Sequence, residues 1–311
     1  MGQVSDIEPI LDASRLWRGA PMALATVIST WGSAPRPRGS HMLVHADGRL
    51  EGSISGGCIE GEVLALAADV IGGAPAQRRT FGVSDGMAWE AGLPCGGSIE
   101  IFVQPVADHG FAPHLFDAVR EARAAGETIA VATHLESGQS RLADVAEEGH
   151  FLNHYAPPRR LFIVGAVQIA QTLVSIARSI DIRPIVIDPR ARFLTEARFP
   201  GTELDDRWPD EAIAAWKPDK ASAIVTLSHD PKIDDPALIA ALAAPTGYVA
   251  ALGSRRSHAA RRERLAAAGL DTATIDRIEG PAGIDIGALG TAEIALSVAA
   301  GLVRALGQRK G

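Results

Sequence analysis

The sequence predicts an α/β protein with two domains, the second built on a doubly wound parallel sheet. The chain has 311 residues, of which 47% are hydrophobic, so it is long enough to bury two cores. Pro157-Pro158-Arg159-Arg160 divides it, because prolines stiffen a connection and do not fit inside a helix. Beyond this point short apolar strands alternate with helical segments, which is typical of parallel α/β sheets. We expect an N-terminal domain over residues 1–156, a linker over 157–160 and a C-terminal domain over 161–311.

The N-terminal part is expected to be a small α/β domain. Apolar residues at helical spacing predict a helix over Ile7–Arg18. An Asp-Gly pair predicts a tight turn over residues 46–49. The further expected elements are strands over Met22–Ser29, His41–His45 and Leu50–Ser55, a helix over Glu60–Ile71, strands over Arg78–Phe81 and Ser98–Pro105, a helix over Leu115–Ala125, and strands over Thr128–His134 and Gly149–Ala156.

The C-terminal part predicts a Rossmann-like domain. A continuous apolar strand over Leu161–Val164 is followed by a turn at Gly165 and a helix over Ala166–Ile180. Further buried strands are expected over Pro184–Ile187, Ile224–Leu227 and Tyr248–Leu252, the last two each followed by a helix-like segment. This alternation favours a doubly wound sheet with helices on both faces.

Both cysteines of the chain lie in glycine-rich turns. Gly56 and Gly57 directly precede Cys58, and Gly96 and Gly97 directly follow Cys95. Glycine permits left-handed backbone and close approach of a ligand, so these turns are able to present a sulfur atom. The alternative is that both are small buried hydrophobic residues, the commonest fate of free cysteine.

A ligand- or sulfur-handling role is favoured for Cys58, because it precedes the predicted helix over Glu60–Ile71 and a helix N-terminus favours the thiolate. The same strand, turn and helix order aims backbone N–H groups at an anion. Structural zinc is weakly supported, since the two cysteines are 37 positions apart and lack paired spacing.

The turn at Gly165 has part of the dinucleotide-binding pattern. Asp188 follows the second strand, at the position of the acid that binds a ribose in such folds. The three-glycine fingerprint is incomplete, because Val167 occupies the place where the backbone must approach a pyrophosphate. We therefore predict no ordinary NAD binding, although a phosphate of another ligand could use the helix N-terminus.

Three further stretches have two interpretations each. Arg36 and Arg38 lie in a Pro/Gly loop and are either solvated or contacts for an anion. Ser228-His229-Asp230 follows a parallel strand, where α/β sheets place ligand groups, but Ser228 or Asp230 could equally cap a helix. Gly253-Ser254-Arg255-Arg256 has the same position and the same two interpretations. Signatures of hydrolases, P-loop proteins and zinc proteases are absent from the sequence.

The composition limits which binding partners and which cellular compartment are expected. A net charge of −7 does not favour nucleic acid, which needs clustered Lys and Arg. Two cysteines are too few for a disulfide framework, and the first residues lack the regions of a signal peptide. Apolar runs such as Ile286–Val303 are interrupted by polar residues, so no membrane span is expected. We expect a cytoplasmic protein with reduced thiols.

Taken together, seven stretches resemble the XdhC/CoxI family of accessory proteins for molybdenum hydroxylases such as xanthine dehydrogenase and carbon monoxide dehydrogenase. They are Gly32–Arg36, Ser55–Gly61, Cys95–Glu100, Ile187–Arg190, His229–Lys232, Ala251–Arg256 and Gly283–Ala288, in this order. The chain departs from many relatives at Gly165-Ala166-Val167-Gln168, where these look like Gly-Ala-Gly-His.

The resemblance implies a chaperone, not an enzyme, that binds the molybdenum cofactor (molybdopterin) while a cysteine desulfurase supplies its sulfido ligand. It also implies delivery to an apo molybdenum hydroxylase, and we expect a homodimer. Cys58 and Cys95 would contact molybdenum or sulfur, and the glycine turns at 56–57 and 96–97 would offer N–H groups to the pterin. Arg36, Arg190 and Arg255 would contact the cofactor phosphate. Gly165, Asp188 and His229 complete the expected cofactor-binding residues.

Two other functions are left open. The chain could be an NAD(P)-dependent oxidoreductase that uses Cys58 as a redox thiol, although Val167 argues against it. It could also be an adaptor that binds a partner and no ligand, in which case the cysteine turns would have no role.

Overall fold

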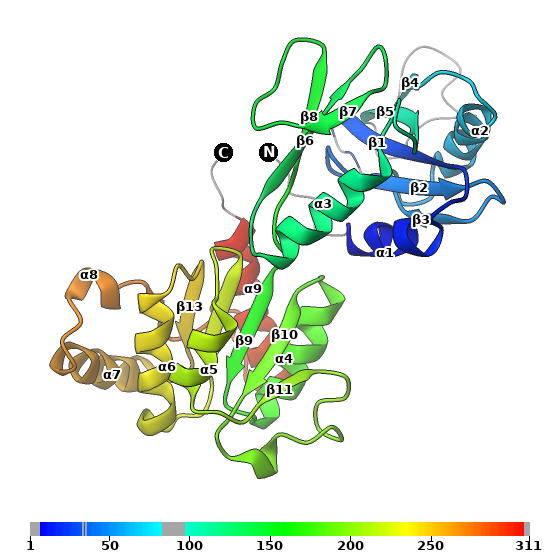
Figure 1. Ribbon diagram of the computed structural model, residues 1–311. Helices are drawn as coiled ribbons and strands as arrows, with labels where there is room; N and C mark the ends of the chain where they lie inside the picture. Colours follow the sequence, from blue (N-terminus) through cyan, green and yellow to red (C-terminus); the bar gives the residue numbers. More distant parts are fainter. Residues whose placement is uncertain (1–6, 33, 35, 83–96, 308–311) are drawn as a thin grey trace. The chain divides into compact units, whose positions relative to one another are not determined.

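The computed structural model describes residues 7–32, 34, 36–82 and 97–307. The chain divides into two compact units, Met1–Pro157 and Pro158–Gly311. Each unit has its own sheets and hydrophobic cores (Figure 1). The predicted mixed α/β fold class is confirmed.

The first unit contains a five-stranded sheet in the order β3-β2-β1-β5-β4, in which every neighbouring pair is antiparallel. Its strands are β1 (Met22–Trp31), β2 (His41–His45), β3 (Leu50–Gly52), β4 (Gln77–Gly82) and β5 (Ser98–Pro105). Side chains alternate between two cores: Ala23 and Ala25 pack with α2 (Glu60–Ile71), whereas Leu24 packs with α1 (Glu8–Leu16) and α3 (Pro113–Ala124). The sheet is therefore covered on both faces.

A second, three-stranded sheet has the order β7-β6-β8. It consists of β6 (Ile129–His134), β7 (Ser140–Leu142) and β8 (His150–Tyr155), all antiparallel. The sequence does not predict β7. The predicted strand Leu50–Ser55 is too long: β3 ends at Gly52, whose φ of +84° is outside the strand region.

The second unit is a six-stranded parallel sheet with the order β11-β10-β9-β12-β13-β14. Its strands are β9 (Arg160–Val164), β10 (Arg183–Ile187), β11 (Glu203–Asp205), β12 (Ser222–Thr226), β13 (Tyr248–Ala251) and β14 (Ile278–Glu279). Numbered along the chain, this is the 3-2-1-4-5-6 order of the Rossmann fold. The strand order reverses between β9 and β12, where such sheets bind ligands at their carboxyl edge.

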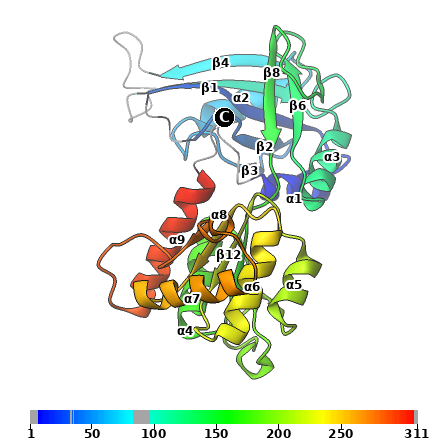
Figure 2. The same ribbon diagram turned by 90° about the vertical axis from the view of Figure 1, so that its left-hand side faces the viewer.

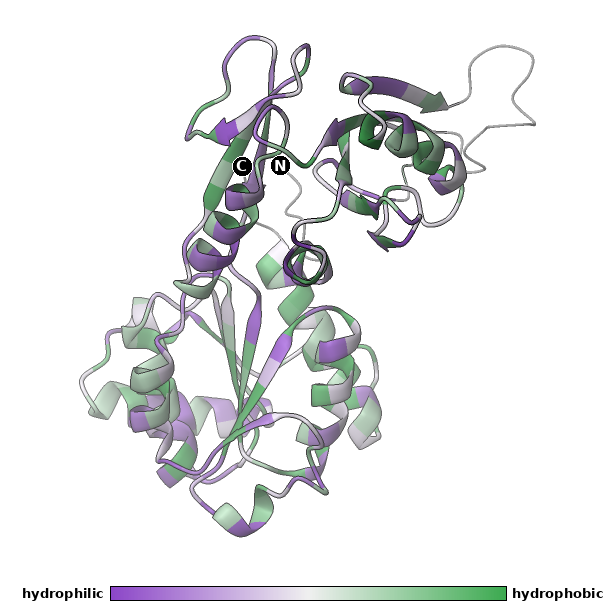
Figure 3. Cartoon of the chain, turned by 45° about the vertical axis from the view of Figure 1, so that its right-hand side comes forward, coloured by the Kyte–Doolittle hydropathy of each residue, from purple (hydrophilic) through white to green (hydrophobic). Residues whose placement is uncertain are grey.

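Helices cover both faces of this sheet (Figure 2). One face packs against α4 (Gln168–Ser179) and α9 (Thr291–Gly307), and the other against α5 (Pro209–Trp216), α6 (Pro231–Ala243) and α7 (Arg255–Ala267). The short elements η1 (Ala191–Phe193) and α8 (Thr272–Ile275), like α5, β11 and β14, are not predicted from the sequence. Figure 3 shows that the helices carry both hydrophobic and hydrophilic residues, as helices on a buried sheet do.

Candidate functional site

The turn that carries Cys58 connects β3 to α2. Its two glycines have left-handed backbone, with φ of +73° at Gly56 and +109° at Gly57. A β carbon at either glycine would meet nothing within 4 Å, so backbone conformation and not crowding explains the residue type. Cys58 itself is exposed. The alternative that it is a buried hydrophobic residue is therefore wrong.

The carboxylate of Glu60 holds this turn together. It accepts hydrogen bonds from Ser53 Oγ at 2.9 Å, Ser55 N at 3.0 Å, Gly57 N at 2.9 Å and Ile59 N at 3.3 Å. Ser55 Oγ donates to its second oxygen. Partial burial alone would raise the pKa of Glu60, but these donors lower it to about 2. The carboxylate is thus ionised and fully engaged at neutral pH.

The remaining amides of the turn are also occupied. Ser53 Oγ accepts from Gly56 N at 2.9 Å, and Ser55 Oγ accepts from Cys58 N at 3.0 Å. The expectation that Gly56 and Gly57 offer N–H groups to a ligand is therefore not met in this conformation. What the turn presents is the thiol of Cys58.

The other predicted residues of this unit contribute less. Cys95 and Gly96 lie outside the described residues. Gly97 lies directly before β5, where its carbonyl faces Gly82. Arg36 is half-buried in the connection from β1 to β2.

Arg38, in the same connection, is used structurally. Its Nε donates to Ile28 O at 3.0 Å, and its guanidinium lies 4.7 Å from the centre of the Phe151 ring. These contacts tie the loop to strand β8, so they account for this arginine without an anion.

In the second unit, Asp188 joins the glycine turn to Arg190. Its carboxylate accepts from Ala166 N at 2.7 Å and from Arg190 N, Nε and Nη2 at 2.9, 2.9 and 2.8 Å. The side chain has no exposed surface. Burial alone would raise the pKa of Asp188, but the hydrogen bonds from Arg190 and the amides hold it below its ordinary value.

This geometry corrects the expected role of Asp188. A carboxylate that binds a ribose must face the ligand, whereas this one is buried and has four donors of its own chain. Its contact is structural, and Arg190, which is 35% exposed, is the group that the arrangement presents at the sheet edge.

The stretch after β12 combines a cap with an exposed histidine. Asp230 accepts from Lys232 N at 2.9 Å and caps α6, which confirms the capping interpretation. His229 is exposed and has φ of +62°, a conformation that non-glycine residues rarely adopt. Its amide donates to Asp234 Oδ2 at 3.2 Å, and Ser228 Oγ donates to Asp234 Oδ1 at 2.6 Å.

Two buried charged residues at this edge escape sequence reasoning. Asp234 is 2% exposed and Arg261 4% exposed, and Arg261 Nη2 lies 4.0 Å from Asp234 Oδ2. Burial raises the pKa of Asp234 above its ordinary value. The only sequence signal is that both are charged residues on the inner faces of α6 and α7.

The stretch after β13 is again a cap. Ser254 Oγ accepts from Ser257 N at 3.1 Å, and Arg255 is exposed in the first turn of α7. The helix dipole does not stabilise a cation at the N-terminus of a helix. Arg255 therefore gains no electrostatic stabilisation from α7.

The structure brings some predicted residues together. The edge of the parallel sheet near the reversal of strand order holds Gly165, Asp188, Arg190 and His229. A β carbon on Gly165 would lie 2.8 Å from Ser228 N, next to His229, and Asp188 bonds to Arg190. Arg255 follows the adjacent strand β13. Cys58 lies in the other unit, with Gly56 and Gly57.

Within the described ranges, no three His, Cys, Asp or Glu side chains are grouped as a metal ion would require. No described helix has both the length and the apolarity needed to cross a membrane.

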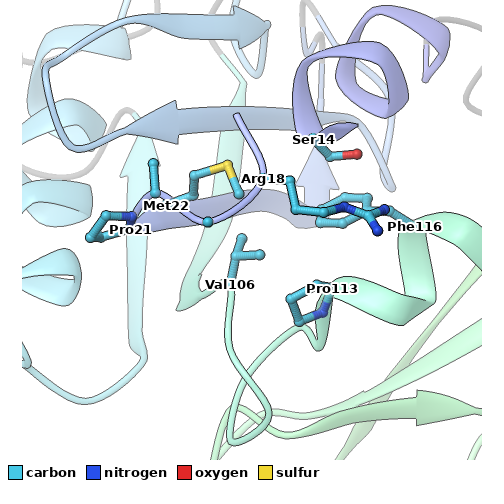
Figure 4. Close-up of a pocket in the computed structure, with 9 residues that line it drawn as sticks. Ser14, Arg18, Pro21, Met22, Val106, Pro113 and Phe116 are labelled. Carbon is cyan, nitrogen blue, oxygen red and sulfur yellow. The ribbon is translucent and has the colours of Figure 1, made fainter. Parts of the chain in front are cut away.

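A pocket of about 330 Å³ in the first unit holds none of the predicted residues (Figure 4). Arg18 on its wall is paired with Asp117 at 2.8 Å. The other residues that line it are small or mainly apolar: Ser14, Gly19, Ala20, Pro21, Met22, Val106, Pro113 and Phe116. We assign it no chemistry.

Two family models match the chain. The XdhC Rossmann domain matches residues 161–302, and the XdhC and CoxI family matches residues 16–82. The molybdenum cofactor insertion chaperone PaoD of Escherichia coli is 29% identical over 303 residues, covering 92% of this chain and 83% of PaoD. A probable xanthine dehydrogenase subunit of Bacillus subtilis is 25% identical over 320 residues, covering 90% and 92% of the two chains.

A solved structure agrees with these matches. A crystal structure from Bacillus halodurans, described as a xanthine dehydrogenase, superposes with a TM-score of 0.82 at 25% identity. The superposition covers 99% of this chain and 97% of the other. The predicted resemblance to the XdhC and CoxI family is thereby confirmed, with family models matching residues 16–82 and 161–302 of this chain.

Proposed function

We propose that this protein is a maturation chaperone that binds the molybdenum cofactor, supports its sulfuration and delivers it to an apo molybdenum hydroxylase. The matches to two XdhC family models support the proposal, together with similarity to a relative named as a molybdenum cofactor insertion chaperone. The observation that carries it is the exposed Cys58 thiol on a turn whose backbone is held by Glu60.

The chemistry of this thiol suits the proposed cargo. Thiolate is a soft ligand and favours soft, thiophilic centres such as molybdenum bound to a dithiolene. A surface thiol on a rigid turn could hold such a centre, or the sulfur destined for it, with little loss of conformational entropy. Cys95 is proposed for the same role on the basis of its sequence context.

The second unit offers groups for the anionic part of the cofactor. Arg190, which follows β10, is partly exposed, and Arg255, which follows β13, is exposed. A guanidinium binds a phosphate through two parallel hydrogen bonds. His229 and the Gly165 turn lie at the same sheet edge. Asp188 supports this set indirectly, by fixing Arg190 to the turn. In the first unit, Arg36 is proposed as a further phosphate contact.

The proposed partners follow from the same function. They are a cysteine desulfurase as the source of sulfur and an apo hydroxylase of the xanthine or carbon monoxide dehydrogenase type as the recipient. A homodimer, a cytoplasmic location and the absence of catalysis belong to the proposal as well.

The test is binding of molybdenum cofactor under anaerobic conditions by wild type, Cys58→Ala and Cys95→Ala, with bound molybdenum measured per protein chain. Stoichiometric binding by the wild type and its loss in C58A would support the proposal. Equal binding by wild type and C58A would exclude the thiol contact. Absence of binding by the wild type would exclude the chaperone function.

One observation favours a second candidate, an NAD(P)-dependent oxidoreductase with Cys58 as a redox thiol. The sheet has the strand order of dinucleotide-binding folds. Against it, Val167 interrupts the glycine fingerprint and Asp188 is buried under four hydrogen bonds. We expect no thermal stabilisation by NADH. A stabilisation that grows with NADH concentration would favour the oxidoreductase.

A further inference from the structure

The amides of the Cys58 turn converge on a carboxylate that belongs to the turn itself. Amide groups arranged this way usually bind an external anion. Here Ser55, Gly57 and Ile59 donate their N–H groups to Glu60, and Ser53 and Ser55 add their hydroxyls. The place of an anionic ligand is thus taken by a side chain.

We infer that Glu60 is the positioning residue of this turn, which it holds in the form that presents the Cys58 thiol while closing the turn's amides to oxyanions. The ligand of the turn is then one that bonds to sulfur and not one that is bound through phosphate. The identity of that ligand as the molybdenum cofactor rests on the proposed function. The role of Glu60 in shaping the turn does not.

Charge-assisted hydrogen bonds are stronger than neutral ones, so one carboxylate with five donors fixes the turn more firmly than its two flexible glycines would allow. Removal of that carboxylate leaves the amides of Ser55 and Gly57 without acceptors, which costs free energy and loosens the turn, whereas Ile59 N keeps Ser55 Oγ as an acceptor at 3.0 Å. Cys58 is exposed and depends on this anchor, because its own backbone N–H is held by Ser55 Oγ, which in turn donates to Glu60.

The first test needs no cofactor. Amide hydrogen exchange of residues 53–60 is measured in wild type, E60Q and E60A, with E62Q as the matched control. Glu62 lies on the same helical turn and is exposed. We expect exchange at Ser55 and Gly57 to become about tenfold faster in E60A and E60Q and to stay unchanged in E62Q. Exchange at Ile59 should change less, because Ser55 Oγ still accepts from its amide.

Chemical rescue separates this role from a general loss of folding. The gap left in E60A is lined by amides and hydroxyls, so sodium formate should restore the protection of these amides, and sodium chloride of equal ionic strength should not. Unchanged exchange in E60A, or faster exchange throughout the unit without rescue by formate, would overturn the inference.

The second test addresses Cys58. Cofactor binding is measured for wild type, for E62Q, and for E60A with and without formate. We expect about tenfold weaker binding in E60A, recovery with formate, and no effect of E62Q. Wild-type affinity in E60A would overturn the inference. Failure of the wild type itself to bind would reject the proposed function, and the exchange result would still decide the role of Glu60.

Discussion

Gly165 and Ser228 lie against each other where the strand order of the parallel sheet reverses. A β carbon on Gly165 would stand 2.8 Å from Ser228 N and 3.0 Å from Ser228 Cα. Gly165 also has φ of +107°, which side chains disfavour. We therefore expect G165A to lower the free energy of unfolding by about 2–4 kcal/mol, measured by urea denaturation.

The control is Gly269, which has φ of +96° and where an added β carbon would meet no atom within 4 Å. G269A therefore meets the same kind of backbone strain without the contact, and should cost about 1 kcal/mol. Equal losses of unfolding free energy in G165A and G269A would show that the close approach of Gly165 to Ser228 adds nothing to the cost of the substitution.

Replacing Asp188 by Asn should destabilise the second unit. The amide group of Asn would point donors at Ala166 N or Arg190, where the carboxylate now accepts four hydrogen bonds. We expect D188N to lose about 2–4 kcal/mol at neutral pH, measured by urea denaturation. D206N is the matched control, because Asp206 is exposed.

The pH dependence of this loss has a defined sign. The pKa of Asp188 is lower in the folded than in the unfolded chain, so its contribution is present above the unfolded value and is lost as pH falls through the folded value. The difference between wild type and D188N should therefore shrink in acid. A difference that grows in acid would contradict the assignment.

Arg261 and Arg262 offer a comparison of a buried with a surface arginine. Arg261 is 4% exposed, beside Asp234, whereas Arg262 pairs with the exposed Asp276. We expect R261M to cost about 2–4 kcal/mol, because it removes the buried counter-charge that lies 4.0 Å from Asp234, and R262M to cost less than about 1 kcal/mol. Chemical denaturation of both variants checks this, and similar costs would mean that the buried pair adds no stability.

The scaffold of both units is largely predictable from local sequence. Strands such as β9 and β12 are short apolar runs because helices cover both their faces. Helix α2 has the predicted bounds, since its apolar residues recur at helical spacing. Strand β7 escapes prediction because it has three residues, two of them exposed, and therefore no periodic signal.

The candidate site is less predictable, because its contacts depend on closure of loops. Glu60 is separated by one to seven residues from its donors, and its residue type does not distinguish a carboxylate that folds back from one that faces solvent. The sequence pattern predicts an acid at the position of Asp188 but not its structural role. That role depends on the hydrogen bonds that Arg190, two residues later, donates to its carboxylate. Asp234 and Arg261 meet only once α6 and α7 are packed.

His41 makes the stability of the first unit depend on pH. Its Nδ1 is hydrogen-bonded to Thr26 Oγ1 at 2.9 Å, and its Nε2 lies 3.0 Å from Asn153 Nδ2 and 2.9 Å from the Tyr155 hydroxyl. Burial lowers the pKa of His41 from 6.5 to about 4. Between these values the unfolded chain binds a proton that the folded chain does not, so the free energy of unfolding falls as pH decreases from 6.5 towards 4, by about 3 kcal/mol in total.

Urea unfolding across this pH range should show this fall in the free energy of unfolding for wild type. The control H114Q, which removes an exposed histidine, should show the same fall, and H41Q a smaller one. Because wild type and H41Q share every titrating group except His41, an equally steep slope in H41Q would assign the acid sensitivity to groups other than His41.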